Sequence, residues 1–447
     1  MNRCQAMTLL PAALLAARAG HAQGGGRVIV IVAGLAGLAA ARNLQAAGHE
    51  VIVVAARDRI GGRLWTLRLW PDLPMDLGTS WIHGTSRNPL TALADAAGAD
   101  RVATSYDRSL SLGLDGEEAD LSADSAEALV SAARAGAERL EVDVSLAMAV
   151  QAFPGWTDAD AETRRFLRHY IIDTYEQEYA VDRAEASAWN IHAAREYVGE
   201  DVLFPVGIDQ LTTYLARGLP LRLGQTVTAL APTGDGVRVT LADGSTLEPG
   251  HVVVTLPLGV LKSGSVALGE PLAPARQAAI NGLGMGLLNK CWLRFDRIAG
   301  DADVDWIEWL SPRDGHWSQW VSLGRALAAP VLLACHAGSQ ARTIEALGDA
   351  ATVNGAHDAL KAVFGTAFPA PVAAQITRWS QDPFARGSCS YHAPGTSPDS
   401  RRALAGADWD GRLVFAGEAA EPQSSGAAHG AYLSGGTAAR PIMNHAP

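Results

Sequence analysis

The chain has 447 residues, a formal net charge of −11 at neutral pH, and a hydrophobic content of 48%. This length allows two domains, or one large composite domain with a sizeable core. The negative charge argues against nucleic acid or an anionic membrane surface as the main partner. The four cysteines have no C-x-x-C spacing, so neither a zinc site nor a redox dithiol is indicated.

The N-terminal segment, residues 1–25, resembles an export signal. Arg3 precedes an apolar run from Ala6 to Ala17, and the small residues Gly20 and Ala22 suit a signal peptidase. The run is too short to span a membrane, and we find no later apolar stretch that is long enough. We therefore expect residues 1–25 to lie outside the fold and the protein to be periplasmic or secreted, with a cytoplasmic location as the alternative.

The next residues predict a strand–helix–strand unit. Arg27–Ala33 is a β-branched run that is typical of a buried parallel strand. Leu35–Ala47 has helical composition, and Gly48 suits a helix C-terminus. Glu50–Ala55 repeats the pattern of the first strand, which completes a βαβ unit.

The turn in this unit departs from the dinucleotide-binding pattern G-x-G-x-x-G. It reads VAGLAG, so Gly34, Ala36 and Gly37 follow the pattern, but Val32 replaces the first glycine. Ala55 replaces the acidic residue that would accept hydrogen bonds from a ribose. Amides at the helix N-terminus can still bind phosphate. The turn alone is compatible with a nucleotide site and with an ordinary parallel unit that binds none.

The rest of the chain alternates helical and strand-like regions. Helical patterns dominate residues 89–197, and short strands separated by the turns TGDG and ADG follow in residues 221–255. A mixed region covers residues 296–397, with helices expected near Ala341–Leu347 and Ala356–Phe364. The chain closes with a strand in Arg412–Ala420 and a helix over His429–Arg440.

This order of elements predicts an α/β fold with two domains. Strands from the first, middle and last thirds of the chain would share one sheet. We expect a discontinuous Rossmann-like domain of residues 26–88, 200–290 and 398–447. An inserted α+β domain for the substrate would comprise residues 89–199 and 291–397.

Five further motifs carry a family resemblance. They are ARDRIGGRLWT (residues 56–66), MDLGTSWIHG (75–84), LGMGLLNK (283–290), FAGEAA (415–420) and GAAHGAYLSG (426–435). In this order they resemble the FAD-dependent amine oxidase family, which includes polyamine oxidases and monoamine oxidases. The resemblance spans residues 27–440 and implies FAD as the cofactor.

The resemblance gives the N-terminal motifs roles in binding FAD. It places Arg57, Gly62 and Arg63 near the FAD ribose and diphosphate, beside the glycine-rich turn. A planar guanidinium such as that of Arg63 suits phosphate, although a surface salt bridge is the alternative. Gly78, Thr79 and Trp81 would pass beside the flavin.

Further implied FAD contacts come from the second half of the chain. Backbone amides at Val227 would meet the adenine, and Gly417 and Glu418 would meet the ribityl or diphosphate region. Ala428 would donate its N–H to the flavin pyrimidine, aided by the dipole of the following helix. Some monoamine oxidases attach FAD through a cysteine near the region of Cys389, which is offset from that motif. We therefore expect non-covalent FAD, with covalent attachment through Cys389 as the minor alternative.

Four residues are candidates for the substrate side. The resemblance implies that Lys290 holds a water against flavin N5, although a lysine at a strand edge would look similar. His83 matches the histidine of animal-type polyamine oxidases, or it is a structural loop histidine. Glu178 would pair with amine nitrogens, or it lies on a solvated helix face. Trp379 would form a wall of the flavin site.

The resemblance implies oxidation of a polyamine-like, primary or secondary amine. Hydride would pass from the amine α-carbon to FAD N5, and O2 would then yield hydrogen peroxide, with an imine hydrolysed to aldehyde. The implied partners are a small amine and O2, with no nucleic acid and a homodimer as a candidate assembly. The alternative is an inactive or flavin-poor homologue that acts as a binding protein, because Val32 and Ala55 weaken the ADP site. An amino-acid oxidase is a third hypothesis, which would require an arginine for the substrate carboxylate.

Overall fold

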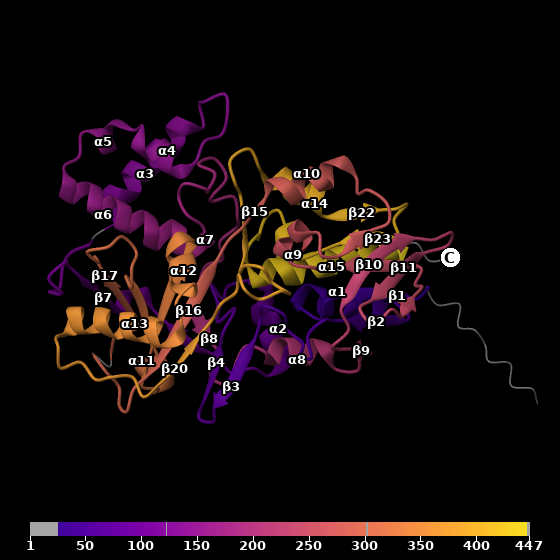
Figure 1. The fold of residues 1–447 in the computed structure, drawn as a ribbon, viewed down its shortest axis with the longest axis horizontal. Helices are drawn as coiled ribbons and strands as arrows, with labels where there is room; N and C mark the ends of the chain where they lie inside the picture. The colour runs from indigo at the N-terminus through magenta and orange to yellow at the C-terminus, as the bar shows by residue number, and fades with distance from the viewer. Residues whose placement is uncertain (1–25, 122, 301–302, 445–447) are drawn as a thin grey trace, which may run out of the picture.

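The computed structural model describes residues 26–121, 123–300 and 303–444. The predicted export segment, residues 1–25, lies outside the described residues. Figure 1 shows β1, β2 and β23 with helices α1 and α15 in one half of the molecule. The other half contains β16, β17 and β20 with helices α12 and α13. Among the described residues, no helix combines the length and hydrophobicity that crossing a membrane requires.

The predicted βαβ unit is confirmed. It consists of β1 (Val28–Ile31), α1 (Leu35–Ala46) and β2 (Val51–Val54). The strands pair in parallel, with Val28 opposite Val51. All four residues of β1 are buried, as expected for a strand inside a parallel sheet that is covered on both faces.

Strands from distant parts of the chain share the sheet of β1 and β2, as the sequence predicts. The order is β22-β23-β13-β1-β2-β9. Its other strands are β9 (Leu221–Arg222), β13 (His251–Val254), β22 (Gly406–Asp408) and β23 (Leu413–Phe415). Only the edge strand β22 runs antiparallel to its neighbour. We call this the first sheet.

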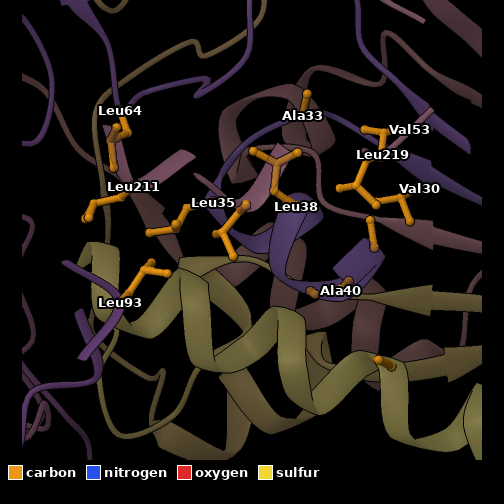
Figure 2. Packing of buried hydrophobic residues seen from close by; sticks show 14 of the residues in the cluster. Val30, Ala33, Leu35, Leu38, Ala40, Val53, Leu64, Leu93, Leu211 and Leu219 are labelled. Carbon is orange, nitrogen blue, oxygen red and sulfur yellow. The ribbon is translucent and has the colours of Figure 1, made fainter. Parts of the chain in front are cut away.

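Helix α15 (Ala428–Asn444) packs against α1 on one face of the first sheet. The two backbones approach closely, since a Cβ at Gly435 would lie 2.1 Å from the Ala36 carbonyl oxygen. Figure 2 shows Leu35 and Leu38 of α1 within the cluster of buried apolar side chains that fills this region. This packing fixes the N-terminus of α1 relative to the edge of the sheet.

A second six-stranded sheet lies in the other half of the molecule, with the order β20-β16-β19-β18-β17-β7. Its strands are β7 (Ser109–Leu112), β16 (Leu288–Arg294), β17 (Trp306–Trp309), β18 (Gln319–Ser322), β19 (Val331–Ala337) and β20 (Ala373–Ile376). Within it, Lys290 on β16 stands opposite Cys335 on β19. The interior strand β16, which lies between β20 and β19, therefore carries the predicted lysine.

The remaining strands form small sheets and hairpins. They are β3 (Thr66–Trp70), β4 (Leu73–Asp76), β5 (Trp81–Ile82), β6 (Val102–Thr104), β8 (Asp201–Leu203), β10 (Val227–Pro232), β11 (Val237–Leu241), β12 (Thr246–Leu247), β14 (Ala267–Leu268), β15 (Gly284–Met285) and β21 (Ser390–Tyr391). The hairpins predicted at the TGDG and ADG turns are confirmed by the antiparallel pairs β10–β11 and β11–β12.

The predicted helical region contains α2 (Pro89–Ala97), α3 (Asp124–Ala137), α4 (Leu146–Gln151), α5 (Pro154–Thr157), α6 (Ala161–Ile171) and α7 (Gln177–Tyr179). A π-helical turn, η2 (Ile172–Glu176), joins α6 to α7. Later helices are α8 (Gln210–Ala216), α9 (Leu258–Ser263), α10 (Pro274–Gly282), α11 (Gly324–Leu327), α12 (Gly338–Glu345), α13 (Asp349–Phe364) and α14 (Pro398–Leu404). The helices expected near residues 341–347, 356–364 and 429–440 are confirmed by α12, α13 and α15.

In the turn after β1, Val32 has the backbone conformation that a glycine at this position would adopt. Val32 has φ 82°, a value that a β-branched residue rarely adopts. Its N–H donates to the Val54 carbonyl at 2.8 Å, and the Thr255 hydroxyl donates to the Val32 carbonyl at 3.3 Å. Holding such a residue there costs about 1–3 kcal/mol, which the surrounding packing must offset.

Gly37 should be intolerant of any side chain. A Cβ at this position would lie 2.0 Å from the Val32 carbonyl oxygen and 3.0 Å from the Thr255 hydroxyl. We expect Gly37→Ala to lower the free energy of unfolding by about 1–3 kcal/mol, the usual range for overpacking. Urea unfolding measures the change.

The matched control is Gly136→Ala in α3, where an added Cβ meets no atom within 4 Å. This substitution should raise the free energy of unfolding by about 0.5–1 kcal/mol, because alanine loses less backbone entropy than glycine. Equal effects of the two substitutions would contradict the close approach of α1 to the turn.

Candidate active site

A cavity of about 140 Å³ lies at the carboxyl ends of β1 and β2. Ligands of parallel α/β sheets commonly bind at such an edge. We call it the sheet-edge cavity. Its lining contains most of the predicted FAD-binding residues: Gly34, Ala36, Arg57, Gly62, Arg63, Thr79, Gly417, Glu418 and Ala428. Segments that are far apart in the sequence thus converge on one cavity.

A second cavity of about 290 Å³ lies between the two sheets, and we call it the inner cavity. Its lining brings together all four predicted catalytic residues, Lys290, His83, Glu178 and Trp379, and also Gly78, Trp81 and Cys389. The two cavities share the lining residues Arg63, Thr79, Ser388, Gly426, Ala427 and Ala428. The cavities are therefore neighbours along one continuous wall.

Two predicted FAD-binding residues line neither cavity. Gly37 lies inside α1, where it lets the helix approach the turn at Val32. Val227 is buried in β10 and packs in the apolar cluster that contains Ile29 and Ile31 of β1. Its contact with adenine remains a prediction.

Arg63 and Glu418 form an ion pair at the junction of the cavities. The Arg63 Nη1 donates to a Glu418 carboxylate oxygen at 2.8 Å and to the Ser388 carbonyl at 2.6 Å. The other Glu418 oxygen accepts from the Ser390 hydroxyl at 2.6 Å. Burial alone would raise the pKa of Glu418, but the charge of Arg63 and these hydrogen bonds lower it. The pair is thus partly buried rather than a surface salt bridge.

Lys290 is 5% exposed, and its Nζ meets three acceptors on one short segment. It donates to the Gly78 carbonyl at 2.6 Å, to the Asp76 carbonyl at 3.1 Å, and to the Ser80 hydroxyl. Burial lowers the pKa of Lys290. Three acceptors match the three hydrogens of an ammonium. A water bound to Lys290, as the resemblance implies, would have to share or replace one of these hydrogen bonds.

Trp379 is fixed against the same segment. Its indole N–H donates to the Leu77 carbonyl at 3.3 Å, and its ring stands edge-on to Trp65 with the ring centroids 6.3 Å apart. A Cβ at Gly78 would lie 1.6 Å from the Arg63 carbonyl oxygen. Glycine at position 78 thus allows the segment to pass close to the backbone of Arg63.

His83 is paired with an aspartate that the sequence did not indicate. Its Nδ1 lies 2.8 Å from the Asp201 carboxylate, which also accepts the Gly84 N–H at 2.8 Å. Burial alone would lower the pKa of His83, but the hydrogen bond to Asp201 and the charges of Glu178 and Asp201 raise it. The His83 side chain is 56% exposed, and it faces the inner cavity together with Glu178.

Further residues of the inner cavity were missed by the sequence analysis. Trp306 stacks on Tyr106 with ring centroids 4.5 Å apart and on Trp81 at 5.8 Å, which gives the cavity an aromatic wall. Asp173 and Gln177 belong to the same helical region as Glu178 and also line it. Sequence spacing could have indicated Gln177, because it is adjacent to Glu178, but nothing local connects Tyr106 with Trp306.

Asp76 was also missed, although it lies within the motif MDLGTSWIHG. Burial raises its pKa to about 7, even though Thr66 and the Ile208 N–H donate to its carboxyl group. Burial likewise raises the pKa of the Cys389 thiol, to about 11. A thiol with this pKa is a weak nucleophile at neutral pH.

Asp201→Asn should lower the pKa of His83. Asparagine keeps an oxygen for the Gly84 N–H but removes the anion that stabilises the imidazolium. NMR titration of labelled histidines measures the shift, with the His83 signal assigned from His83→Asn. The control is Asp399→Asn, which removes an exposed carboxylate on α14 and should leave the midpoint of the His83 titration unchanged. An unchanged His83 midpoint in Asp201→Asn would contradict the pairing.

Comparisons with known proteins agree with this geometry. The model of the family described as flavin containing amine oxidoreductase matches residues 35–443. The chain is 33% identical over 430 residues to polyamine oxidase 2 of Arabidopsis thaliana, covering 91% of this chain and 86% of that protein. It is 32% identical over 433 residues to polyamine oxidase 4 of Oryza sativa subsp. japonica, covering 92% and 87%.

The chain also resembles larger proteins. It is 32% identical over 440 residues to lysine-specific histone demethylase 1 homolog 3 of Oryza sativa subsp. japonica, covering 94% of this chain and 54% of that protein. The chain thus spans about half the length of this relative. The family match covers most of the chain and implies a flavin cofactor. The chain belongs to the flavin containing amine oxidoreductase family.

Proposed function

We propose that the chain is an FAD-dependent oxidase of amines. FAD would bind non-covalently in the sheet-edge cavity, and the amine would bind in the inner cavity. The observation that carries this proposal is the shared wall of the two cavities, which joins the turn after β1 to the four predicted catalytic residues. Residues 26–88, 200–290 and 398–447 would form the Rossmann-like FAD-binding domain, and residues 89–199 and 291–397 the substrate domain. Residues 1–25 would direct export.

The residues of the sheet-edge cavity fit the diphosphate of FAD. Gly34 begins α1, and no side chain caps the amides of the first turn. These amides and the helix dipole suit an anion. Gly62 lines the cavity with φ 61°, a backbone conformation that residues with a side chain rarely adopt. Arg57 and Arg63 belong to the same lining, and each is paired with a carboxylate, Asp382 and Glu418 respectively. Their guanidinium groups would donate to the diphosphate with the N–H groups that those partners leave open.

The ribose end of the cavity fits FAD less well. Ala55 lines the cavity where an acidic residue would accept hydrogen bonds from ribose hydroxyls. Each such bond to a carboxylate contributes about 1.5–3 kcal/mol. Val32 keeps the required turn only in a strained conformation. We therefore propose weakened but retained FAD binding, and a flavin-poor binding protein is the second candidate.

The bound flavin would accept a hydride from the amine α-carbon and pass electrons to O2, which gives hydrogen peroxide and an imine. The protein would bind and orient the amine. The aromatic wall of Trp81, Tyr106 and Trp306 covers its carbon chain and excludes water. Lys290 holds the segment Asp76–Ser80, and its ammonium places a positive charge on the cavity wall.

Acidic groups in the inner cavity support an amine as the substrate. Glu178 lines the cavity, and its charge acts on His83 across from it. A protonated amine is attracted by a carboxylate in a site with little water. The Asp201 carboxylate stabilises the protonated form of His83. His83 can therefore hold a proton and release it within the same cavity. The proposed substrate is therefore polyamine-like, or a primary or secondary amine.

The visible spectrum of the purified full-length protein tests this function. We expect flavin absorbance, directly or after incubation with excess FAD. Adding an amine without oxygen should bleach that absorbance, and admitting oxygen should restore it. A protein that remains colourless in excess FAD would favour the flavin-poor binding protein over the oxidase.

Lys290→Met should slow the return of flavin absorbance under oxygen by about 10- to 100-fold, because negative charge that develops on oxygen loses a nearby cation. It should also lower the free energy of unfolding by about 1–3 kcal/mol, since buried acceptors lose their donor. Stopped-flow absorbance and urea unfolding measure the two effects. Lys361→Met, on the surface of α13, is the control and should alter neither. A destabilised variant with an unaltered oxygen rate would leave Lys290 with a positioning role alone.

A further inference from the structure

A π-helical turn, η2, shapes part of the wall of the inner cavity. The Gln177 N–H donates to the Ile172 carbonyl, five residues earlier. In an α-helix, residues five apart point about 140° away from each other. A turn with i→i+5 bonds instead brings them to one face, and such turns often occur at functional sites. Asp173, Gln177 and Glu178 accordingly all line the inner cavity.

Two acceptor atoms on this wall have no hydrogen-bond donor within the described part of the protein. They are Asp173 Oδ2 and Gln177 Oε1. The Asp173 side chain is 9% exposed, and Gln177 is 5% exposed. A buried acceptor without a donor is costly in free energy and calls for an explanation. A ligand that carries N–H groups would satisfy both atoms.

The partners of these two side chains fix their orientation. Gln177 Nε2 donates to the Cys335 carbonyl at 3.1 Å, which directs the amide oxygen away from β19. Asp173 Oδ1 accepts from the Ser318 hydroxyl at 3.2 Å. His169 Nε2 lies 3.2 Å from Asp173 Oδ2, in a geometry that does not form a hydrogen bond. Neither side chain has to move to present its open oxygen.

The charge around Asp173 favours a cation. The side-chain nitrogen or oxygen atoms of His169, Asp173 and Glu308 lie within 4.8 Å of one another. Burial raises the pKa of Asp173 to about 7 and also raises the pKa of Glu308. Burial lowers the pKa of His169, so this histidine supplies little positive charge at neutral pH. A ligand cation would supply the missing partner.

We infer that Asp173 and Gln177 form a subsite for a second, protonated nitrogen of the substrate, remote from the nitrogen that reacts. The substrate would then carry at least two nitrogens separated by a carbon chain. Of the three clustered residues, Asp173 lines the inner cavity, whereas His169 and Glu308 do not. An occupant of the cavity therefore reaches Asp173 first, which favours an ammonium group over a metal ion held by all three. The inference rests on the proposed function for the position of the reacting nitrogen.

Calorimetric binding of two probes to the full-length protein tests the subsite without turnover. The probes are 1,8-diaminooctane and nonylamine, in which a methyl group replaces one ammonium. We expect Asp173→Asn to lower the affinity for the diamine by about 10- to 100-fold relative to the affinity for the monoamine, because one charge-assisted contact is lost. Gln177→Leu should lower the affinity for the diamine by about 2- to 10-fold, as expected for the loss of a neutral acceptor.

Asp358→Asn is the matched control. It removes an exposed carboxylate on α13 and should leave the ratio of the two affinities unchanged. If both Asp173→Asn and Gln177→Leu keep the wild-type ratio, the subsite is overturned. Asp173-dependent binding of zinc chloride with an unaltered amine ratio would make the cluster a metal site and would also overturn it.

These outcomes separate the subsite from the proposed oxidase. Bleaching of the flavin by amines with an unaltered affinity ratio would remove the subsite and leave the oxidase. A shifted ratio in a protein that no amine bleaches would support the subsite and contradict the oxidase.

Discussion

The buried ammonium of Lys290 is the interaction on which the inner cavity depends. It lies on β16, an interior strand of the second sheet, and donates to the segment Asp76–Ser80. A buried charge must be satisfied by hydrogen bonds, so the segment has little freedom to move. Thr79, within that segment, lines both cavities. One side chain thus holds the second sheet to the segment that lines both cavities where they meet.

The wall around this point has an uneven distribution of charge. At the junction, Arg63 neutralises Glu418, whose pKa is lowered. Asp173, on the wall of the inner cavity, and its neighbour Glu308 have raised pKa values because burial outweighs the effect of any cation near them. The first arrangement is complete within the protein, whereas in the described part of the chain Asp173 has beside it only His169, whose pKa is lowered. This difference is the physical basis for expecting a cationic ligand beside Asp173.

The turn after β1 shows that a fold can retain a conformation after its preferred residue is lost. Val32 adopts φ 82° because parallel pairing of β1 with its neighbours and the close approach of α1 leave no other path. The strain is held by many contacts rather than by the residue itself. The surrounding fold cannot compensate for Ala55 in this way, because backbone geometry does not supply the carboxylate that would accept hydrogen bonds from the ribose. The two departures from the pattern therefore have different consequences.

The sequence by itself determined the elements whose signals are local. The β-branched runs of β1 and β2, the turns of the hairpins and the glycine-rich motifs predict strands, turns and a flavin-type family because each depends on neighbouring residues. Sequence order also indicated one sheet built from three parts of the chain. Only the tertiary structure paired His83 with Asp201 and stacked Trp306 on Tyr106, since these partners are more than one hundred residues apart. It also decided which buried acceptors, such as Asp173 Oδ2, have no donor, because burial and the absence of a partner are properties of packing and not of sequence.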